Sequence, residues 1–289
     1  MGLDLLRRPG ELPKLVGHRG ACDVAPENTM VSFQRALDDG ADIVEMDLRL
    51  SLDAQVVVVH DARVDRTSDG VGYVSELTVA ELKQLDAGSW FSPEYAGERI
   101  PTADEVFDWA KGKIGLLLEL KFQLYGGYDP ALVPAVLAAI SRAGVADQTA
   151  MICYQPRALV QVKALAPHFP VGPLPPRDPM LYLTQRLVRR LPKLERTPIL
   201  RGLLSRVLLR PLHFTLAWGC DVVAPNIDMV TSTLVDAAHT AGCPVSSGGL
   251  LWDYPQAINM GVDTVSANDP GMVRALYLSS DIGLPLDQD

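Results

Sequence analysis

Titratable side chains stand at the ends of several short apolar runs in the first half of the chain. His18 and Arg19 follow the run at 14–16, and His60 follows four consecutive valines. Imidazole titrates near neutral pH, so one histidine can take a proton from a nucleophile while another gives one to a leaving oxygen. His18 and His60 are therefore candidates for an acid/base pair.

Carboxylates recur within two further apolar runs. Glu45 and Asp47 are two residues apart, and so are Glu119 and Lys121, so each pair points to one face of a strand. Three converging carboxylates repel one another unless a cation lies among them, and oxygen ligands suit hard divalent ions. We expect a site for Mg or Ca, with Mn as a further candidate. A buried structural salt bridge is the alternative for Glu45 and Asp47.

The same apolar runs carry two cations, Arg19 and Lys121. Beside a divalent metal they favour an anionic substrate, phosphate above all. A metal, two cations, a base and an acid together suit phosphoryl transfer at a diester.

Apolar runs that alternate with helical patterns indicate an α/β protein with parallel strands. About eight such units in roughly 250 residues predict a (β/α)8 TIM barrel, whose chemistry gathers at the carboxyl ends of the strands. A doubly wound sheet is the alternative, although no G-x-G-x-x-G follows the first strand. The apolar runs lie at 14–18, 42–50, 56–61, 114–121, 149–155, 170–175, 221–227, 243–249 and 263–269.

We expect one barrel domain over 1–289 with two insertions. The first, a small subdomain at 61–113 after strand 2, is polar and rich in glycine and turns. The second, at 176–216 after strand 5, has nine basic and two acidic residues in a chain of net charge -9. It predicts two basic amphipathic helices, which pack on the barrel, form a lid on an anionic membrane, or mediate a homodimer.

Composition narrows the class of protein further. A net charge of -9 argues against nucleic-acid binding, and the four cysteines show no CxxC pairing. The N-terminus has no secretory pattern, and no apolar run is long enough to cross a bilayer. We therefore expect a cytoplasmic protein, peripheral to the inner face of the membrane if 176–216 binds lipid.

Five motifs together resemble the glycerophosphodiester phosphodiesterases: HRGACDVAPENT, EMDLRLSLDAQVVVVHD, DRTSDGVGYVSELT, IPTADEVFDW and LLLELK. The resemblance covers about 15–155 and 220–275. It implies a (β/α)8 barrel that hydrolyses glycerophosphodiesters to glycerol phosphate and an alcohol. It also implies that His18 and His60 are the acid/base pair, that Arg19 and Lys121 bind the phosphate, and that the metal ligands are Glu45, Asp47 and Glu119.

Residues 26–29, Pro-Glu-Asn-Thr, support the loop that carries His18. Glu27 and Asn28 are expected to fix this loop by hydrogen bonding, and Glu27 to orient groups of the site. The same residues are also an ordinary helix start, with Asn28 or Thr29 as the N-cap.

The chain departs from the family pattern in two places. Where the family commonly has Trp-Thr-Val-Asn near strand 7, this chain has Ser-Ser-Gly-Gly at 246–249. Where strand 8 usually ends in Thr-Asp-x-Pro, this chain has Ala-Asn-Asp-Pro at 267–270. Both changes concern specificity for the alcohol or glycerol. Lysophospholipid substrates of a lysophospholipase D-type enzyme, or a non-catalytic phosphodiester-binding or lipid-binding module, are the alternatives.

Overall fold

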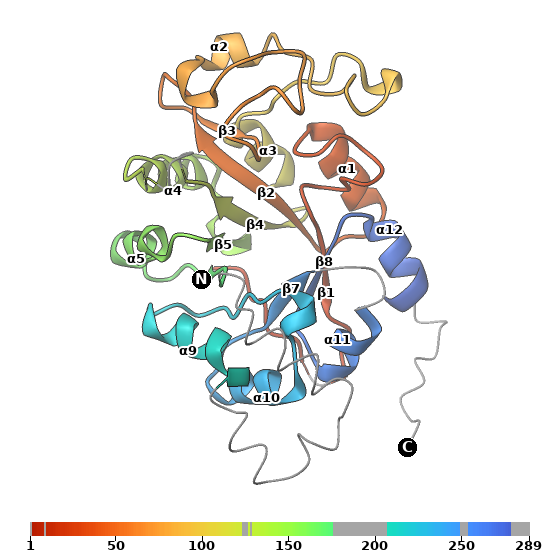
Figure 1. The fold of residues 1–289 in the computed structure, drawn as a ribbon, viewed down its shortest axis with the longest axis vertical. Coiled ribbons are helices and arrows are strands. Elements are labelled where there is room, and N and C mark those ends of the chain that lie inside the picture. Colours follow the sequence, from red (N-terminus) through yellow and green to blue (C-terminus); the bar gives the residue numbers. More distant parts are fainter. Residues whose placement is uncertain are drawn as a thin grey trace.

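A computed structural model describes residues 2–8, 10–122, 127, 129–175, 207–248 and 254–278 of the chain. Parallel strands form a curled sheet in the order β6-β5-β4-β2-β1-β8-β7 (Figure 1). These strands are β1 (Lys14–Gly17), β2 (Ile43–Leu50), β4 (Gly115–Leu120), β5 (Thr149–Cys153), β6 (Val171–Pro173), β7 (Ser246–Gly248) and β8 (Thr264–Ala267).

An extended segment at 221–226 joins the two ends of this sheet. The backbone N–H groups of Asp221 and Val222 donate to the carbonyl of Val171 in β6, at 2.9 and 3.0 Å. On the other side Val223 pairs in parallel with Val245, next to β7. This segment takes the place of the strand expected at 221–227, so the hydrogen bonding runs around a ring. The barrel prediction is confirmed, and the doubly wound alternative is wrong.

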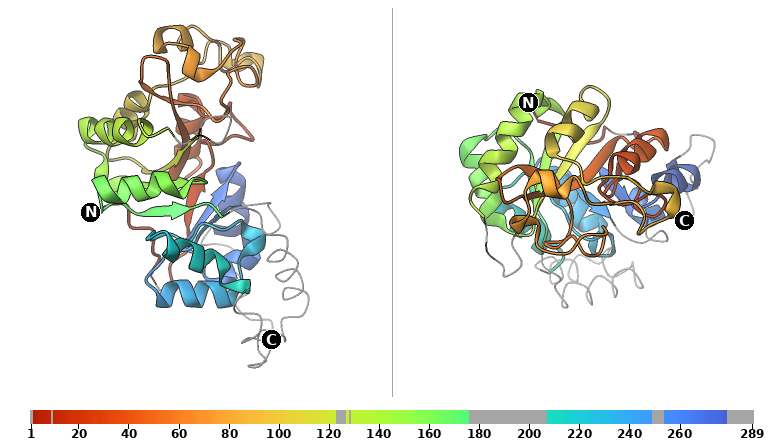
Figure 2. Two further views of the ribbon diagram at one scale, coloured as in Figure 1. Left: turned by 60° about the vertical axis from the view of Figure 1, so that its left-hand side comes forward. Right: turned by 90° about the horizontal axis from the view of Figure 1, so that it is seen from above.

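Helices surround the strands when the molecule is seen from above (Figure 2). The first of them begins after Thr29, whose hydroxyl accepts from the backbone N–H of Ser32, so Thr29 is the N-cap. The helices are α1 (Met30–Asp38), α3 (Ala103–Ala110), α4 (Leu132–Ala143), α5 (Pro156–Leu165), α9 (Arg210–Ala217), α10 (Ser232–Thr240), α11 (Tyr254–Met260) and α12 (Pro270–Val273), followed by a π-helical turn at Arg274–Leu278.

The two faces of β2 carry different side chains, because successive residues of a strand alternate. Val44, Met46 and Leu48 belong to the buried cluster that packs against the helices. Ile43 belongs to a second apolar cluster, which also contains Leu5 from the N-terminal segment. Glu45 and Asp47 follow Ile43 on the same face of β2. Charged residues therefore replace apolar ones toward the carboxyl end of this row.

The segment between β2 and α3, which overlaps the insertion predicted at 61–113, begins with a strand outside the ring. β3 (Val56–Val58) pairs antiparallel with β2. It is followed by the short helical segments η1 (Val74–Glu76), α2 (Val79–Leu82) and η2 (Pro93–Tyr95). β3, η1 and α2 share a small apolar cluster that includes Val57, Val74 and Leu82. Figure 1 shows them above the end of β2, and α3 packs instead in the main core through Phe107.

Most of the basic segment at 176–216 lies outside the described residues, which resume at 207 with α9 following soon after. Gly249 and Trp252 near strand 7 also fall outside them. Among the residues that the structure describes, no helix is both long and apolar enough to cross a membrane.

The glycine at position 20 is required by both its backbone angle and its surroundings. Its φ is +87°, and a Cβ there would lie 2.3 Å from Ser32 Oγ. Gly112 also has a positive φ, +69°, but a Cβ there would meet nothing within 4 Å. We expect Gly20→Ala to lower the free energy of unfolding by about 3 kcal/mol and Gly112→Ala by only about 1 kcal/mol, measured by urea denaturation. Equal losses would show that crowding against Ser32 is unimportant.

Candidate active site

The carboxylates of Glu45, Asp47 and Glu119 form one buried cluster at the carboxyl ends of β2 and β4. Parallel register places Asp47 directly beside Glu119. One carboxylate oxygen from each residue lies within 4.8 Å of the other two, and the residues are 3%, 1% and 8% exposed. The cluster expected from the two-residue spacings is therefore present.

Two cations balance this negative charge. Lys121 Nζ lies 2.9 Å from Asp47 Oδ1 and also contacts Glu119. Arg19 Nε lies 3.4 Å from Asp47 Oδ2, and its Nη1 lies 2.9 Å from Glu27. Both cations predicted to bind phosphate thus lie beside the carboxylates, because a buried negative cluster needs compensating charge.

The carboxylates differ in their protonation. Burial, followed by the charges of Asp47 and Glu119, raises the pKa of Glu45 well above its usual value. Burial also acts to raise the pKa of Asp47, but Lys121 and neighbouring positive groups hold it below the ordinary value. Of Glu45 and Asp47, Asp47 is therefore the one that keeps its negative charge to lower pH.

The cluster fits a hard divalent cation. Its ligands are all oxygens, the type that Mg, Ca and Mn prefer. Glu45 Oε2 accepts from the backbone N–H of Arg19 at 2.8 Å, while the buried Oε1 accepts no hydrogen bond from the described residues. A buried carboxylate oxygen without a donor is costly, and a cation at this position removes that cost.

His18 is oriented by an amide. Its Nδ1 lies 2.8 Å from Asn268 Oδ1, and the backbone N–H of His18 donates to the carbonyl of Ala267 at 2.9 Å. Asn268 is itself held, because its Nδ2 donates to Asp23. Since Asn268 Oδ1 only accepts, it fixes the proton of His18 on Nδ1 and leaves Nε2 for chemistry. Burial, followed by the charge of Arg19, lowers the pKa of His18.

His60 is oriented by a carboxylate. Its Nδ1 lies 2.6 Å from Asp61 Oδ1, and Arg66 Nε donates to Asp61 Oδ2. Burial acts to raise the pKa of Asp61, but the bonds from Arg66 and His60 lower it to about 2. The carboxylate is thus ionised at neutral pH. Burial nevertheless lowers the pKa of His60 itself.

Glu27 and Asn28 connect the first loop to this network. Asn28 Nδ2 donates to Asp47 Oδ2 at 2.7 Å, and Asn28 Oδ1 accepts from the backbone N–H of Asp47. Glu27 accepts from both Arg19 and Arg66. Arg19 and Asn28 hold this geometry with left-handed φ values of 49° and 57°.

Three residues that orient the histidines were not assigned that role from the sequence. Asp61 adjoins His60, and that adjacency was an available signal. Asn268, whose change was linked to specificity, instead meets His18 across 250 residues, and Arg66 meets Asp61 across five residues and Glu27 across 39. Local spacing carries no information about such contacts.

The chain is similar in sequence to a family of known proteins. Residues 18–272 match the sequence profile of the Glycerophosphoryl diester phosphodiesterase family. A putative glycerophosphodiester phosphodiesterase of Bacillus subtilis is 51% identical over 107 residues, covering 37% of this chain and 44% of that protein. A glycerophosphodiester phosphodiesterase of Caldanaerobacter subterraneus is 39% identical over 161 residues, covering 55% and 65%. The matches therefore span less than two thirds of these relatives.

Solved structures share the fold over nearly the full length. A phosphodiesterase of Oleispira antarctica, in complex with the product sn-glycerol-3-phosphate, is 27% identical with a TM-score of 0.74 and covers 93% of this chain and 98% of its own. A putative glycerophosphoryl diester phosphodiesterase of Silicibacter pomeroyi has a TM-score of 0.77 at 24% identity, with 95% of each chain covered.

The raised pKa of Glu45 predicts that this carboxylate destabilises the metal-free protein. A carboxyl group with a raised folded-state pKa favours folding at low pH, and that contribution is lost as pH rises through the folded pKa. We expect Glu45→Gln to raise the free energy of unfolding at pH 7 in chelator by about 1 kcal/mol.

Denaturation at two pH values checks this expectation. The gain should shrink at pH 4, where Glu45 is protonated in the unmodified protein. A Gln variant that is less stable than the parent at pH 7 would contradict it.

Proposed function

Because the chain belongs to the Glycerophosphoryl diester phosphodiesterase family, we propose that it hydrolyses glycerophosphodiesters to glycerol phosphate and an alcohol. One observation carries the proposal: two histidines, each held through Nδ1, accompany a buried cluster of three carboxylates at the carboxyl ends of the barrel strands. The glycerol phosphate product bound to the Oleispira relative supports this substrate class.

In this proposal Glu45, Asp47 and Glu119 hold one divalent ion, with Mg or Ca favoured over Mn. The ion supplies Lewis-acid stabilisation of negative charge on the phosphoryl oxygens. Arg19 and Lys121 supply fixed positive charge next to the same cluster, so they donate hydrogen bonds to the phosphate. Arg19 and Lys121 then contact both the substrate phosphate and the carboxylates.

His18 and His60 move the protons in this proposal. Each imidazole has Nδ1 engaged, so Nε2 is the atom that exchanges a proton with substrate. One imidazole takes a proton at Nε2 from a water molecule as the water oxygen bonds to phosphorus. The other, as the imidazolium, donates its Nε2 proton to the alcohol oxygen as the bond from that oxygen to phosphorus breaks. The loop residues Glu27 and Asn28 position this pair through Arg66 and Asp47.

A lysophospholipase D-type activity on lyso-lipids is the second candidate, favoured by the basic and apolar sequence at 176–216. In that case the segment contacts an anionic membrane surface, and the protein is cytoplasmic and peripheral to the inner leaflet. If the protein cleaves only soluble diesters, the segment serves for packing or as a homodimer contact.

Phosphorus NMR with Mg, Ca or Mn present tests the function directly. We expect release of glycerol phosphate from glycerophosphocholine, and His18→Ala should lower turnover by at least about 100-fold. The control His168→Ala changes an exposed histidine and should retain full activity. Mn binding followed by electron paramagnetic resonance should be unaffected in His18→Ala.

Other results of the phosphorus NMR experiment would change the proposed function. Turnover mainly of lysophosphatidylcholine would select the second candidate. If the purified protein binds metal yet cleaves neither substrate, the catalytic proposal is wrong and a binding module remains. Equal turnover by His18→Ala and the parent would remove His18 from the mechanism.

The amide that orients His18 gives a prediction about pH. Asn268→Asp places a negative charge against Nδ1, which stabilises the imidazolium, so the His18 pKa should rise by about 1 unit. The corresponding limb of the kcat/KM profile should move to higher pH. Asp269→Asn changes the neighbouring residue, which caps α12 and does not contact His18, so it should leave the profile in place. An identical profile for Asn268→Asp and the parent would contradict the assigned contact.

A further inference from the structure

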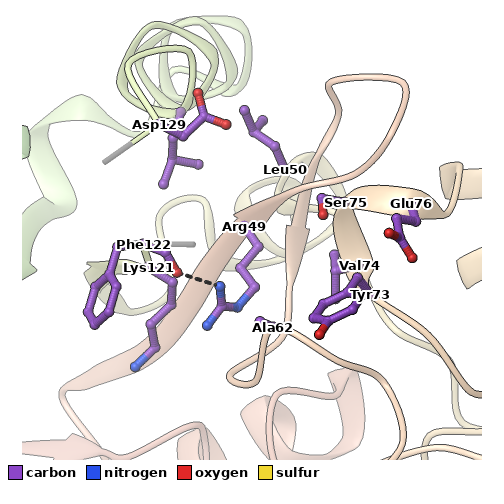
Figure 3. Close-up of a pocket in the computed structure, with 11 residues that line it drawn as sticks. Arg49, Leu50, Ala62, Tyr73, Val74, Ser75, Glu76, Lys121, Phe122 and Asp129 are labelled. Carbon is purple, nitrogen blue, oxygen red and sulfur yellow. Dashed lines mark hydrogen bonds between the residues drawn. The ribbon is translucent and has the colours of Figure 1, made fainter. Parts of the chain in front are cut away.

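A cavity of about 200 Å³ is lined by Arg49 and by Lys121 (Figure 3), and Lys121 also contacts the carboxylate cluster. We call it the Arg49 pocket. It lies between β2, the η1 segment of the insertion and the start of α4. Its polar side chains include Arg49, Tyr73, Ser75, Glu76 and Asp129, and its apolar ones include Leu50, Val74, Phe122 and Leu132.

Arg49 links this pocket to the candidate active site. It lies two residues beyond Asp47 in β2, so it continues the row of side chains that begins with Glu45. Its Nε and Nη2 donate to the carbonyl of His60 at 3.0 and 2.7 Å, and Nη1 donates to the carbonyl of Phe122 (Figure 3). The floor of the pocket is therefore in contact with the peptide that carries His60.

The polar groups of the pocket differ in charge and in depth. Arg49 is half-buried and uses three of the five guanidinium N–H groups in these contacts. Ser75 and Glu76 are exposed at the rim. Tyr73 lies under Arg63, whose guanidinium is 4.7 Å from the ring centre. The lining thus combines the guanidinium of Arg49 with the carboxylates of Glu76 and Asp129 and the hydroxyls of Tyr73 and Ser75.

We propose that the Arg49 pocket binds the alcohol portion of the diester and selects neutral polyhydroxy alcohols over quaternary ammonium alcohols. The inference rests on the proposed function, because it assigns the leaving group of that reaction. Lys121 borders both the pocket and the carboxylate cluster. In this proposal the phosphate lies at Lys121 and the alcohol extends past the Lys121 side chain into the pocket.

The charge distribution selects the class of alcohol. A quaternary ammonium group has no N–H to donate and would bring its positive charge toward Arg49, which is fixed there by two carbonyls. A polyol carries no charge, accepts from guanidinium N–H groups, and donates to the Glu76 carboxylate. Its C–H groups pack against the apolar side of the pocket. A polyol can therefore hydrogen-bond to both the guanidinium and the carboxylates of the lining, whereas a quaternary ammonium group can hydrogen-bond to neither.

The test compares kcat/KM for glycerophosphoinositol and glycerophosphocholine. We expect the parent protein to favour the inositol diester by about tenfold or more, the value of one well-placed hydrogen bond to a charged group. Glu76→Ala should remove most of this preference, and Ser75→Trp should reduce it by filling the rim. Both residues are exposed, so the substitutions leave the core intact.

Glu94→Ala is the matched control, because Glu94 is also an exposed glutamate in a short helical segment of the insertion and does not line the pocket. It should keep the parental ratio. Equal kcat/KM for the two diesters in the parent would overturn the proposal, as would identical ratios in Glu76→Ala and Glu94→Ala.

Saturation-transfer NMR makes the pocket testable without turnover. We expect myo-inositol to receive saturation from the parent protein and to lose it in Ser75→Trp, while choline receives none. If neither diester is cleaved but this binding pattern holds, the proposed function fails and the pocket stands. If both diesters are cleaved but inositol and choline bind alike, the pocket assignment fails and the function stands.

Discussion

The contact between Lys121 and Asp47 is the interaction on which the site depends. Three carboxylates are gathered where the barrel wall excludes water, an arrangement that repulsion and burial both oppose. Lys121 lies 2.9 Å from Asp47 and also reaches Glu119, so one buried cation holds two strands' acidic groups together. Glu45 has a raised pKa, and one of its buried oxygens has no hydrogen-bond donor among the described residues. The protein thus accepts local instability where a metal ion fits.

The two histidines are held by separate hydrogen-bond networks. His60 is held by Asp61, then Arg66 and Glu27, and Glu27 also accepts from Arg19. This path crosses from the insertion to the loop after β1, so the insertion is part of the site's support. His18 is held by Asn268 after β8. Residues that follow the first and the last strand of the barrel therefore meet at the acid/base pair.

The barrel makes these contacts compatible with a stable core. On the outer face of β2 and β4 apolar residues pack against helices, while the inner face changes from apolar to acidic toward the carboxyl end. The charged layer is thus confined to the mouth, where substrate and ions enter. Arg49 is the next residue on the same face of β2 after Glu45 and Asp47, and it lines the Arg49 pocket.

The sequence by itself determined most of the strands, a helix start at residue 28 or 29, and the carboxylate cluster. These features are local: the period of two in a strand puts Glu45 with Asp47 and Glu119 with Lys121, and a threonine before an apolar helical face marks an N-cap. The family resemblance added the acid/base roles proposed for His18 and His60.

Only the tertiary structure decided how the barrel closes and what orients its histidines. The segment at 221–226 completes the ring through isolated bridges, and β3 pairs antiparallel outside it. Asn268 meets His18 across 250 residues, and Arg66 meets Glu27 across 39. Such contacts follow from the curvature and register of the whole sheet, which spacing along the chain does not encode.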